Sequence, residues 1–449
     1  DLSGVRSREE FEAAIEAQHQ NLPEGAWLVA SGWSDGNWPG HQLPGSGWLR
    51  AAGDRPVVAY RMDIHGAVVN WPVLELAAQR WAELGKPGPL PGAESGFLVE
   101  AALWEGVNPL IPPLDAAARQ DALVQAQPKL HAFGLTALGS MEYMRDVVNV
   151  IQPMRDDGRL TIRCPITVLD RDWPLDIEPG RAFPGDEMLF IRGYKAFLDG
   201  SFGSRTAKML DAYADDPNNS GQLVELAADG HLEEWINAVL DAGFSPSMHA
   251  IGDAAVRLAL DATHASIDPA RVRIEHAQHV HPDDISRFDG LIASMQPLHR
   301  ADDGRFIEAR LGPERVPGAF AFRQLLQAGA KLAFGSDWPV VSPDPVAGAR
   351  AAITGFTLDG TAFRPEEDLS VEETFRAYTI DAAEALGLSE CGVLDPGSQA
   401  DLVVFDIDPR HAAWTGAPPG VLMTMVGGSI VHLEASLDSS LPDPVAPPG

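Results

Sequence analysis

Four polar residues, each at the end of a short apolar run, have side chains that can bind metal ions. They are Lys195, His249, His276 and Asp337, in the runs IRGYKAFLDG, FSPSMHAIGD, VRIEHAQH and KLAFGSDWP. A buried strand followed by a loop gives this pattern, with the polar group at the carboxyl end of the strand. Two imidazoles, one carboxylate and one lysine form a ligand set suited to zinc or a similar divalent ion. The sequence therefore predicts a metal site built from separate segments.

Each of these residues also has an ordinary structural explanation. A histidine in a protein core is often satisfied by a backbone carbonyl, and Lys195 is close enough in sequence to Asp199 to pair with it. However, all four residues occupy the same place in their strand-and-loop units. One shared site explains this better than four independent coincidences.

The chain from residue 134 onward alternates apolar runs with amphipathic helical segments, which is typical of an α/β fold. Residues at the ends of successive parallel strands converge on one face of a (β/α)8 TIM-type barrel. After Leu388, short apolar runs separated by Pro and Gly predict part of a small β-sandwich satellite. The expected barrel strands lie in the segments GLTALGSM, LTIRCPITV, IRGYKAFL, SPSMHA, VRIEH, LIASMQ and KLAFGSD.

Residues 1–130 are rich in Gly, Pro and Trp and contain two helical segments, SREEFEAAIEAQ and PVLELAAQRWAEL. Ser7 and Glu10 form a capping-box pattern, which predicts the start of the first helix. Tryptophans such as Trp33 and Trp38 suit either the wall of an apolar pocket or an ordinary core. The sequence leaves both explanations open.

Several segments resemble the amidohydrolase superfamily, and most closely the branch that contains N-substituted formamide deformylase and related metal-dependent hydrolases. The motifs HAIGD, RIEHAQ and GSD, in this order, are specific to that family. The resemblance implies that residues 1–130 elaborate the connection between the first two barrel strands and cover the barrel mouth. It assigns residues 131–388 to the catalytic barrel and residues 389–449 to the carboxyl-terminal part of the sandwich. The matching segments are YKAFLDGSFGSRTA, HAIGDAAVRLALDA, RIEHAQHVHPDDISRF, IASMQPLH, FGSDWPV and GVLDPGSQADLVVFDIDP.

One feature of the superfamily is missing from this chain. The superfamily carries a His-x-His pair on its first barrel strand, but no such pair precedes Lys195, and the only one present is His279 with His281. Because seven strands are expected rather than eight, we expect the first strand and its pair to lie ahead of Asp1 in a longer protein. The alternative is a member that has lost the pair and binds one metal ion or none.

The resemblance also implies how the metal is held. The amine of Lys195 would react with carbon dioxide to give a carbamate that bridges metal ions, a reaction that an apolar environment favours by lowering the amine pKa. His249 and His276 would complete the coordination as neutral imidazoles. Asp337 would contact both a metal ion and the attacking water. We expect zinc, with one or two ions per chain.

Four further residues are predicted to support the site. Asp253 and Glu275 are expected behind the ligands, where they would orient the imidazoles, although each also suits an ordinary helix-start or surface carboxylate. His65 and His299 match positions that face the pocket, so they are expected to contact substrate.

The predicted reaction is hydrolysis of an amide-type C–N bond, as in an N-formyl or small N-acyl amine. A metal ion lowers the pKa of its water, and Asp337 would take the proton and pass it to the leaving nitrogen. Two alternatives stay open. One is hydrolysis of a cyclic amide, a urea or an ester, and the other is an inactive, metal-free relative that only binds ligands.

The charge of the chain excludes some partners. There are 33 basic and 64 acidic residues, which give a net charge of −31. Such a field repels phosphate backbones and anionic lipids, so we expect a small-molecule substrate and neither nucleic acid nor a membrane. Only Cys164 and Cys391 are present, which indicates a reducing compartment, so we expect a cytoplasmic location. A homo-oligomer is compatible with the sequence.

Overall fold

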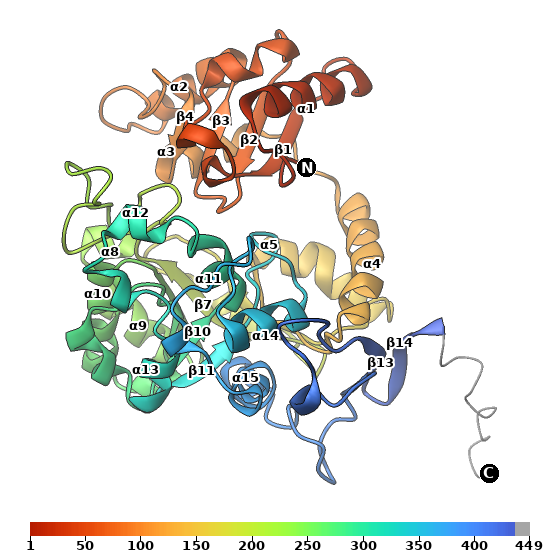
Figure 1. The fold of residues 1–449 in the computed structure, drawn as a ribbon. Helices are drawn as coiled ribbons and strands as arrows, with labels where there is room; N and C mark the ends of the chain where they lie inside the picture. Colours follow the sequence, from red (N-terminus) through yellow and green to blue (C-terminus); the bar gives the residue numbers. More distant parts are fainter. Residues whose placement is uncertain (436–449) are drawn as a thin grey trace.

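Seven parallel strands form one curled sheet at the centre of the molecule (Figure 1). The structure is a computed structural model that describes residues 1–435. Neighbouring strands are hydrogen-bonded in the order β11-β10-β9-β8-β7-β6-β5. All seven strands expected from the sequence are therefore confirmed. Their bounds are β5 (Ser140–Glu142), β6 (Cys164–Val168), β7 (Leu189–Phe197), β8 (Ser245–Ala250), β9 (Arg273–His276), β10 (Ile292–Met295) and β11 (Lys331–Phe334).

The curled sheet is open on one side. Within residues 1–435 its outer strands, β5 and β11, do not pair with each other, and both line a cavity of about 970 Å³. The sequence predicted a (β/α)8 barrel with seven of its strands in this chain; these seven strands are present, and within the described residues they do not close into a barrel. What they form is an α/β fold around a curled, parallel, seven-stranded sheet.

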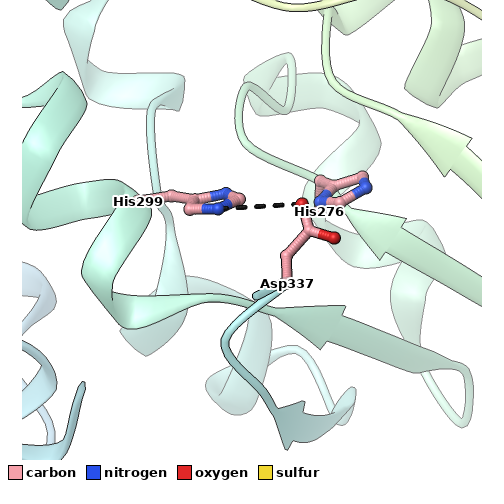
Figure 2. Close-up of side chains that lie close together, drawn as sticks. All are labelled: His276, His299 and Asp337. Carbon is pink, nitrogen blue, oxygen red and sulfur yellow. Dashed lines mark ion pairs between the residues drawn. The ribbon is translucent and has the colours of Figure 1, made fainter. Parts of the chain in front are cut away.

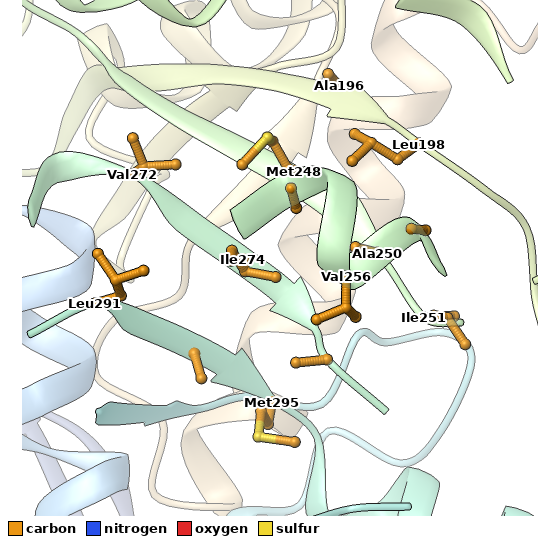
Figure 3. Close-up of a cluster of buried hydrophobic side chains, with 14 of the residues drawn as sticks. Ala196, Leu198, Met248, Ala250, Ile251, Val256, Val272, Ile274, Leu291 and Met295 are labelled. Carbon is orange, nitrogen blue, oxygen red and sulfur yellow. The ribbon is translucent and has the colours of Figure 1, made fainter. Parts of the chain in front are cut away.

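Alternation along the strands separates a polar interior from an apolar exterior. Successive residues of a strand point to opposite faces, so Met248 and Ile274 point away from the interior and join the main apolar cluster (Figure 3). Ser247 and Glu275 point the other way, and the Ser247 hydroxyl donates a 2.6 Å hydrogen bond to the Glu275 carboxylate. The same alternation brings Lys195 into the interior.

Helices cover the outer face of the sheet. In α9 (Leu232–Asp241), the buried side chains recur at intervals of three and four residues, so they form one apolar face. That face packs against β8 and against α10 (Asp253–Ala265). Each large apolar side chain removed from water there contributes about 1.5–3 kcal/mol. The buried residues of α9 are Leu232, Trp235, Ile236, Val239 and Leu240.

The amino-terminal residues form a lobe that lies over the ends of the parallel strands (Figure 1). Of its helices, α1 (Arg8–Asn21) and α2 (Trp71–Glu83) confirm the two predicted helical segments. Ser7 caps α1 by accepting a hydrogen bond from the Glu10 amide. The lobe also contains a sheet that the sequence did not predict, because its strands are short and two of them, β2 and β3, are buried on both faces. They are β1 (Leu28–Trp33), β2 (Val57–Arg61), β3 (Gly66–Val69) and β4 (Phe97–Val99).

The tryptophans of the lobe are mainly core residues. Trp33, Trp38 and Trp48 are buried and pack with Phe11 in one apolar cluster. The Trp33 and Trp38 rings are stacked, with centroids 6.0 Å apart. Core packing, rather than the wall of a substrate pocket, therefore explains these residues.

The carboxyl-terminal segment forms one antiparallel sheet of β12 (Leu402–Phe405), β13 (Val421–Val426) and β14 (Ser429–Leu433). It packs against α4 (Ala116–Ala132), a helix that runs through the predicted boundary at residue 130. The described residues of this segment form one sheet, and a β-sandwich, of which the sequence predicted the carboxyl-terminal part, is not confirmed. Residues 436–449, the end of the predicted 389–449 segment, lie outside them. Over residues 1–435, no helix has both the length and the apolar character needed to cross a membrane.

Candidate metal and active site

Three segments far apart in the sequence bring His276, His299 and Asp337 together (Figure 2). One ligand atom from each side chain lies within 4.8 Å of the other two. His276 ends β9, Asp337 follows β11, and His299 lies on α11 (Pro297–Asp303) after β10. The sequence predicted His276 and Asp337 at the ends of strands, and the structure places both there. The third group, His299, lies on the helix after β10.

The backbone is strained at both strand-end residues. His276 has a φ of 73° and Asp337 a φ of 57°, in the left-handed region that non-glycine residues rarely adopt. Such conformations persist where the surrounding structure holds them, and they concentrate at functional sites. Here they bring the imidazole at the end of β9 and the carboxylate after β11 close together, across the end of the one intervening strand, β10.

The His276 ring has the protonation state that metal binding requires. Burial, with a contribution from nearby Lys195, holds its pKa well below the usual value, so the ring is neutral at pH 7. Its Nδ1 lies 2.8 Å from Oε1 of Gln296, an oxygen that can only accept a hydrogen bond. The proton therefore sits on Nδ1, and Nε2 presents a lone pair.

Asp337 is a carboxylate with a raised pKa. Its side chain keeps 39% exposure, and it lines both the large cavity and a smaller one of about 50 Å³. Burial in these surroundings raises its pKa to about 6, against the opposing effect of Lys195. A carboxylate with such a pKa can accept and release a proton near neutral pH.

Lys195 and His249 lie beside this group without belonging to it. The His249 ring is 4.5 Å from the His276 ring, but its Nε2 lies 3.1 Å from the Gly200 carbonyl and 3.6 Å from Asp199. Lys195 is 3% exposed and lines the large cavity together with His249, His276 and Asp337. Burial lowers the pKa of its amine to about 8.

The sequence left open an ion pair between Lys195 and Asp199, but Asp199 has other partners in the structure. Its carboxylate accepts hydrogen bonds from the backbone amides of Lys208, Ile251 and Gly252. It therefore ties the loop after β7 to the loop after β8, next to His249. This link between the two loops could not be predicted from the sequence, because three backbone amides, and no particular side chains, donate the hydrogen bonds.

The lobe contributes His65, which reaches the ends of the strands. Its ring lies 5.0 Å from the His249 ring, and its Nδ1 is 3.2 Å from both carboxylate oxygens of Glu100. Burial lowers the His65 pKa, but Glu100 and neighbouring carboxylates more than offset this, so the net pKa is raised. A row of imidazoles thus runs from the lobe across the strand ends. Its members are His65, His249, His276 and His299.

Hydrogen bonds between Asp63 and two serine hydroxyls join the lobe to the loop after β7. Asp63 accepts hydrogen bonds from the Ser201 and Ser204 hydroxyls at 2.5 and 2.8 Å, and it pairs with Arg61 at 2.7 Å. A Cβ on Gly203 would lie 1.8 Å from the Arg61 guanidinium, so only glycine allows this approach. Arg61, Asp63, His65, Ser201 and Gly203 form part of the wall of the small cavity, opposite Asp337.

The two predicted supporting carboxylates have other partners. Asp253 accepts a hydrogen bond from the Leu210 amide and lies 3.5 Å from His279, so it does not contact His249 or His276 by a hydrogen bond that the structure shows. Glu275 pairs with Arg273 at 3.1 Å inside the sheet. The group that orients His276 is instead Gln296, in the segment SMQPLH. Sequence reasoning looked for charged partners and so passed over this amide.

The donor set fits a divalent metal ion. A neutral imidazole with a free lone pair and a carboxylate stand within 4.8 Å of each other, beside a cavity that leaves room for water or substrate. Few protein ligands and an open side are characteristic of catalytic rather than structural zinc sites. The depressed pKa of Lys195 also suits carbamate formation, which needs the neutral amine.

Comparisons with known proteins agree with one another. The Amidohydrolase family matches residues 1–432. Protein LONG AFTER FAR-RED 3 of Arabidopsis thaliana is 33% identical over 96% of this chain and 78% of its own. An uncharacterized metal-dependent hydrolase from Pyrococcus horikoshii has a crystal structure with a TM-score of 0.72 and 28% identity, covering 93% of this chain and 83% of its own. N-substituted formamide deformylase of Arthrobacter pascens is 35% identical over 21% of this chain and 18% of its own.

Proposed function

The chain belongs to the amidohydrolase family, and on this premise we propose that it is a metal-dependent hydrolase of amide-type C–N bonds in small N-formyl or N-acyl amines. The observation that carries the proposal is the approach of His276 and Asp337 from two separate strands. It is supported by the metal dependence of the Pyrococcus hydrolase, which shares the fold over most of this chain.

We assign the metal to Lys195, His249, His276 and Asp337, with zinc as the expected ion and Lys195 as its carbamate. The open approach to these groups from the cavity supports the assignment, as does the low pKa of Lys195. A bound divalent ion would lower the pKa of a water molecule and polarise the substrate carbonyl.

Asp337 is the proposed acid–base residue. A carboxylate oxygen takes a proton from the attacking water, and the same group returns it to the nitrogen that leaves. Burial raises the pKa of this carboxyl to about 6, toward the range in which a group can both accept and release a proton.

His65 and His299 are the proposed substrate contacts. Both line the small cavity with Asp337, one from the lobe and one from α11. A volume of about 50 Å³ suits a small acyl group better than a long one. The partial likeness to N-substituted formamide deformylase supports N-formyl amines as the first substrates to test.

The test is a set of matched substrates with the purified protein. Formanilide and acetanilide represent N-acyl amines, while phenyl acetate, phenylurea and a cyclic amide represent the other bonds. We expect aniline release from formanilide, loss of activity on dialysis against a chelator, and recovery with Zn²⁺. Hydrolysis only of the ester, urea or cyclic amide would contradict the bond type. A protein that binds no metal and hydrolyses none of them would be the inactive relative.

A further inference from the structure

Two neighbouring imidazoles in the site each contact a glutamine, one through the amide oxygen, which accepts, and the other through the amide nitrogen, which donates. The rings of His276 and His299 are nearly parallel, with centroids 6.0 Å apart and 15° between their planes. Each ring uses Nδ1 to contact a glutamine side chain. For His276 the partner atom is Oε1 of Gln296 at 2.8 Å, and for His299 it is Nε2 of Gln278 at 2.9 Å.

These partners require opposite tautomers. A neutral imidazole carries one N–H, and an amide oxygen accepts while an amide N–H donates. His276 must therefore carry its proton on Nδ1, and Nε2 is left as a ligand atom. Gln278 donates to Nδ1 of His299, so the proton of His299 sits on Nε2. The amide of Gln296 is oriented by a second contact, since its Nε2 donates to the Ser294 carbonyl at 3.4 Å.

The Nε2–H of His299 has no acceptor in the described protein. The atom is buried, the side chain is 8% exposed, and no hydrogen-bond partner lies within reach among residues 1–435. The facing acceptor, an oxygen of Asp337, is 3.8 Å away, beyond hydrogen-bond distance. A buried donor without an acceptor costs about 1–3 kcal/mol. His299 is one of the residues that line the small cavity, so a molecule bound there would lie beside this donor.

We infer that His299 is a hydrogen-bond donor to the carbonyl oxygen of a small N-acyl substrate, not a metal ligand, and that Gln278 is the positioning residue that fixes its tautomer. This inference rests on the proposed function and makes it more specific. The two stacked rings then have different roles. His276 presents a lone pair to the metal, and His299 donates a hydrogen bond to the carbonyl oxygen, which becomes negative during the reaction. A donor held in place before reaction stabilises that charge without reorganisation.

Metal content separates the two roles of His299. We compare zinc per chain and formanilide turnover in wild type, His299→Leu, His299→Gln and His276→Leu. The glutamine variant keeps an N–H near the position of Nε2, whereas leucine removes it. We expect both His299 variants to retain zinc at the wild-type level and His276→Leu to lose it. Turnover should fall about 10²–10³-fold in His299→Leu, the loss typical of one such donor, and recover in part in His299→Gln. Zinc loss in both His299 variants, or unchanged turnover in His299→Leu, would overturn the inference.

The tautomer itself can be observed in the metal-free protein. Long-range ¹⁵N–¹H NMR spectra of histidine-labelled protein distinguish Nδ1–H from Nε2–H, and His299→Leu assigns the signal. We expect Nε2–H for His299, and a shift toward Nδ1–H in Gln278→Glu, whose carboxylate can only accept. That variant should lower kcat more than it changes KM, with Gln278→Leu as the matched control without a hydrogen bond. A wild-type His299 protonated on Nδ1 overturns the inference.

The metal and NMR experiments together distinguish a failure of this inference from a failure of the proposed function on which it rests. If wild type binds no zinc and leaves formanilide intact, the proposed function fails. The NMR result still decides the hydrogen-bond assignment of Gln278 and His299.

Discussion

The ends of the parallel strands and the amino-terminal lobe both contribute side chains to the small cavity, but they hold them by different means. His276 and Asp337 are placed by the backbone, at strand ends with left-handed φ values. Asp63 is placed by docking, through hydroxyl contacts from Ser201 and Ser204 in the loop after β7, while Arg61 and His65 are held by carboxylates of the lobe itself. The strand ends thus supply the groups proposed for metal binding and proton transfer, whereas the lobe supplies part of the wall of the small cavity.

The largest expected effect lies at the strand ends. Asp337→Asn removes the group that takes and returns the proton, so turnover of formanilide should fall about 10⁴-fold, at the upper end for acid–base catalysis. The thermal unfolding midpoint should stay close to wild type. Asp283→Asn is the control, because that side chain is 84% exposed. A fully active Asp337→Asn variant would remove this residue from the mechanism.

A substitution in the lobe should instead act on stability. Arg61→Met leaves Asp35 and Asp63 buried without the guanidinium that lies 2.8 and 2.7 Å from them. We expect the free energy of unfolding, measured in urea, to drop by about 3–5 kcal/mol, as when one partner of a buried ion pair is removed. Zinc per folded chain should not change. Arg145→Met, at a side chain with 77% exposure, is the control, and an equal drop there would contradict the docking role.

Glu100→Gln tests whether the lobe also affects substrate binding. This change puts a neutral amide of the same shape in place of the carboxylate that contacts His65. We expect KM for formanilide to rise about tenfold, roughly the value of one hydrogen bond to a charged group, with zinc content unchanged. If zinc were lost instead, His65 would belong with the metal ligands, and the division between the two regions would fail.

The smallest expected effect is a pH dependence of the stability that Asp63 contributes to the folded protein. Burial would raise the pKa of this carboxyl, but Arg61, His65 and two hydroxyl donors outweigh it, so the pKa is lowered. A lowered folded-state pKa gives stability that is present above the unfolded value of about 4 and is lost as pH falls through the folded value. Asp63→Asn should therefore lower the unfolding midpoint at pH 7, and its difference from wild type should shrink in acid. A difference that is constant with pH would exclude Asp63 as its source.

The contrast between the regions also explains what the sequence could predict. The seven strands and the residues at their ends followed from local pattern, because each strand is a short apolar run that ends in one polar group. The contacts of the lobe did not follow, since Glu100, Asp63 and Ser201 gain their partners only when distant segments dock. Gln278 and Gln296 were missed for a related reason. An amide beside an imidazole carries no sequence pattern, and its effect depends on which of its atoms faces the ring.

Anomalous diffraction at the zinc absorption edge, from crystals grown with Zn²⁺, would show whether His276 and Asp337 bind the ion together. We expect a peak at about 2.0–2.2 Å from Nε2 of His276 and from a carboxylate oxygen of Asp337, with His299 outside coordination distance. A zinc-containing crystal with no peak at these two residues would contradict this expectation.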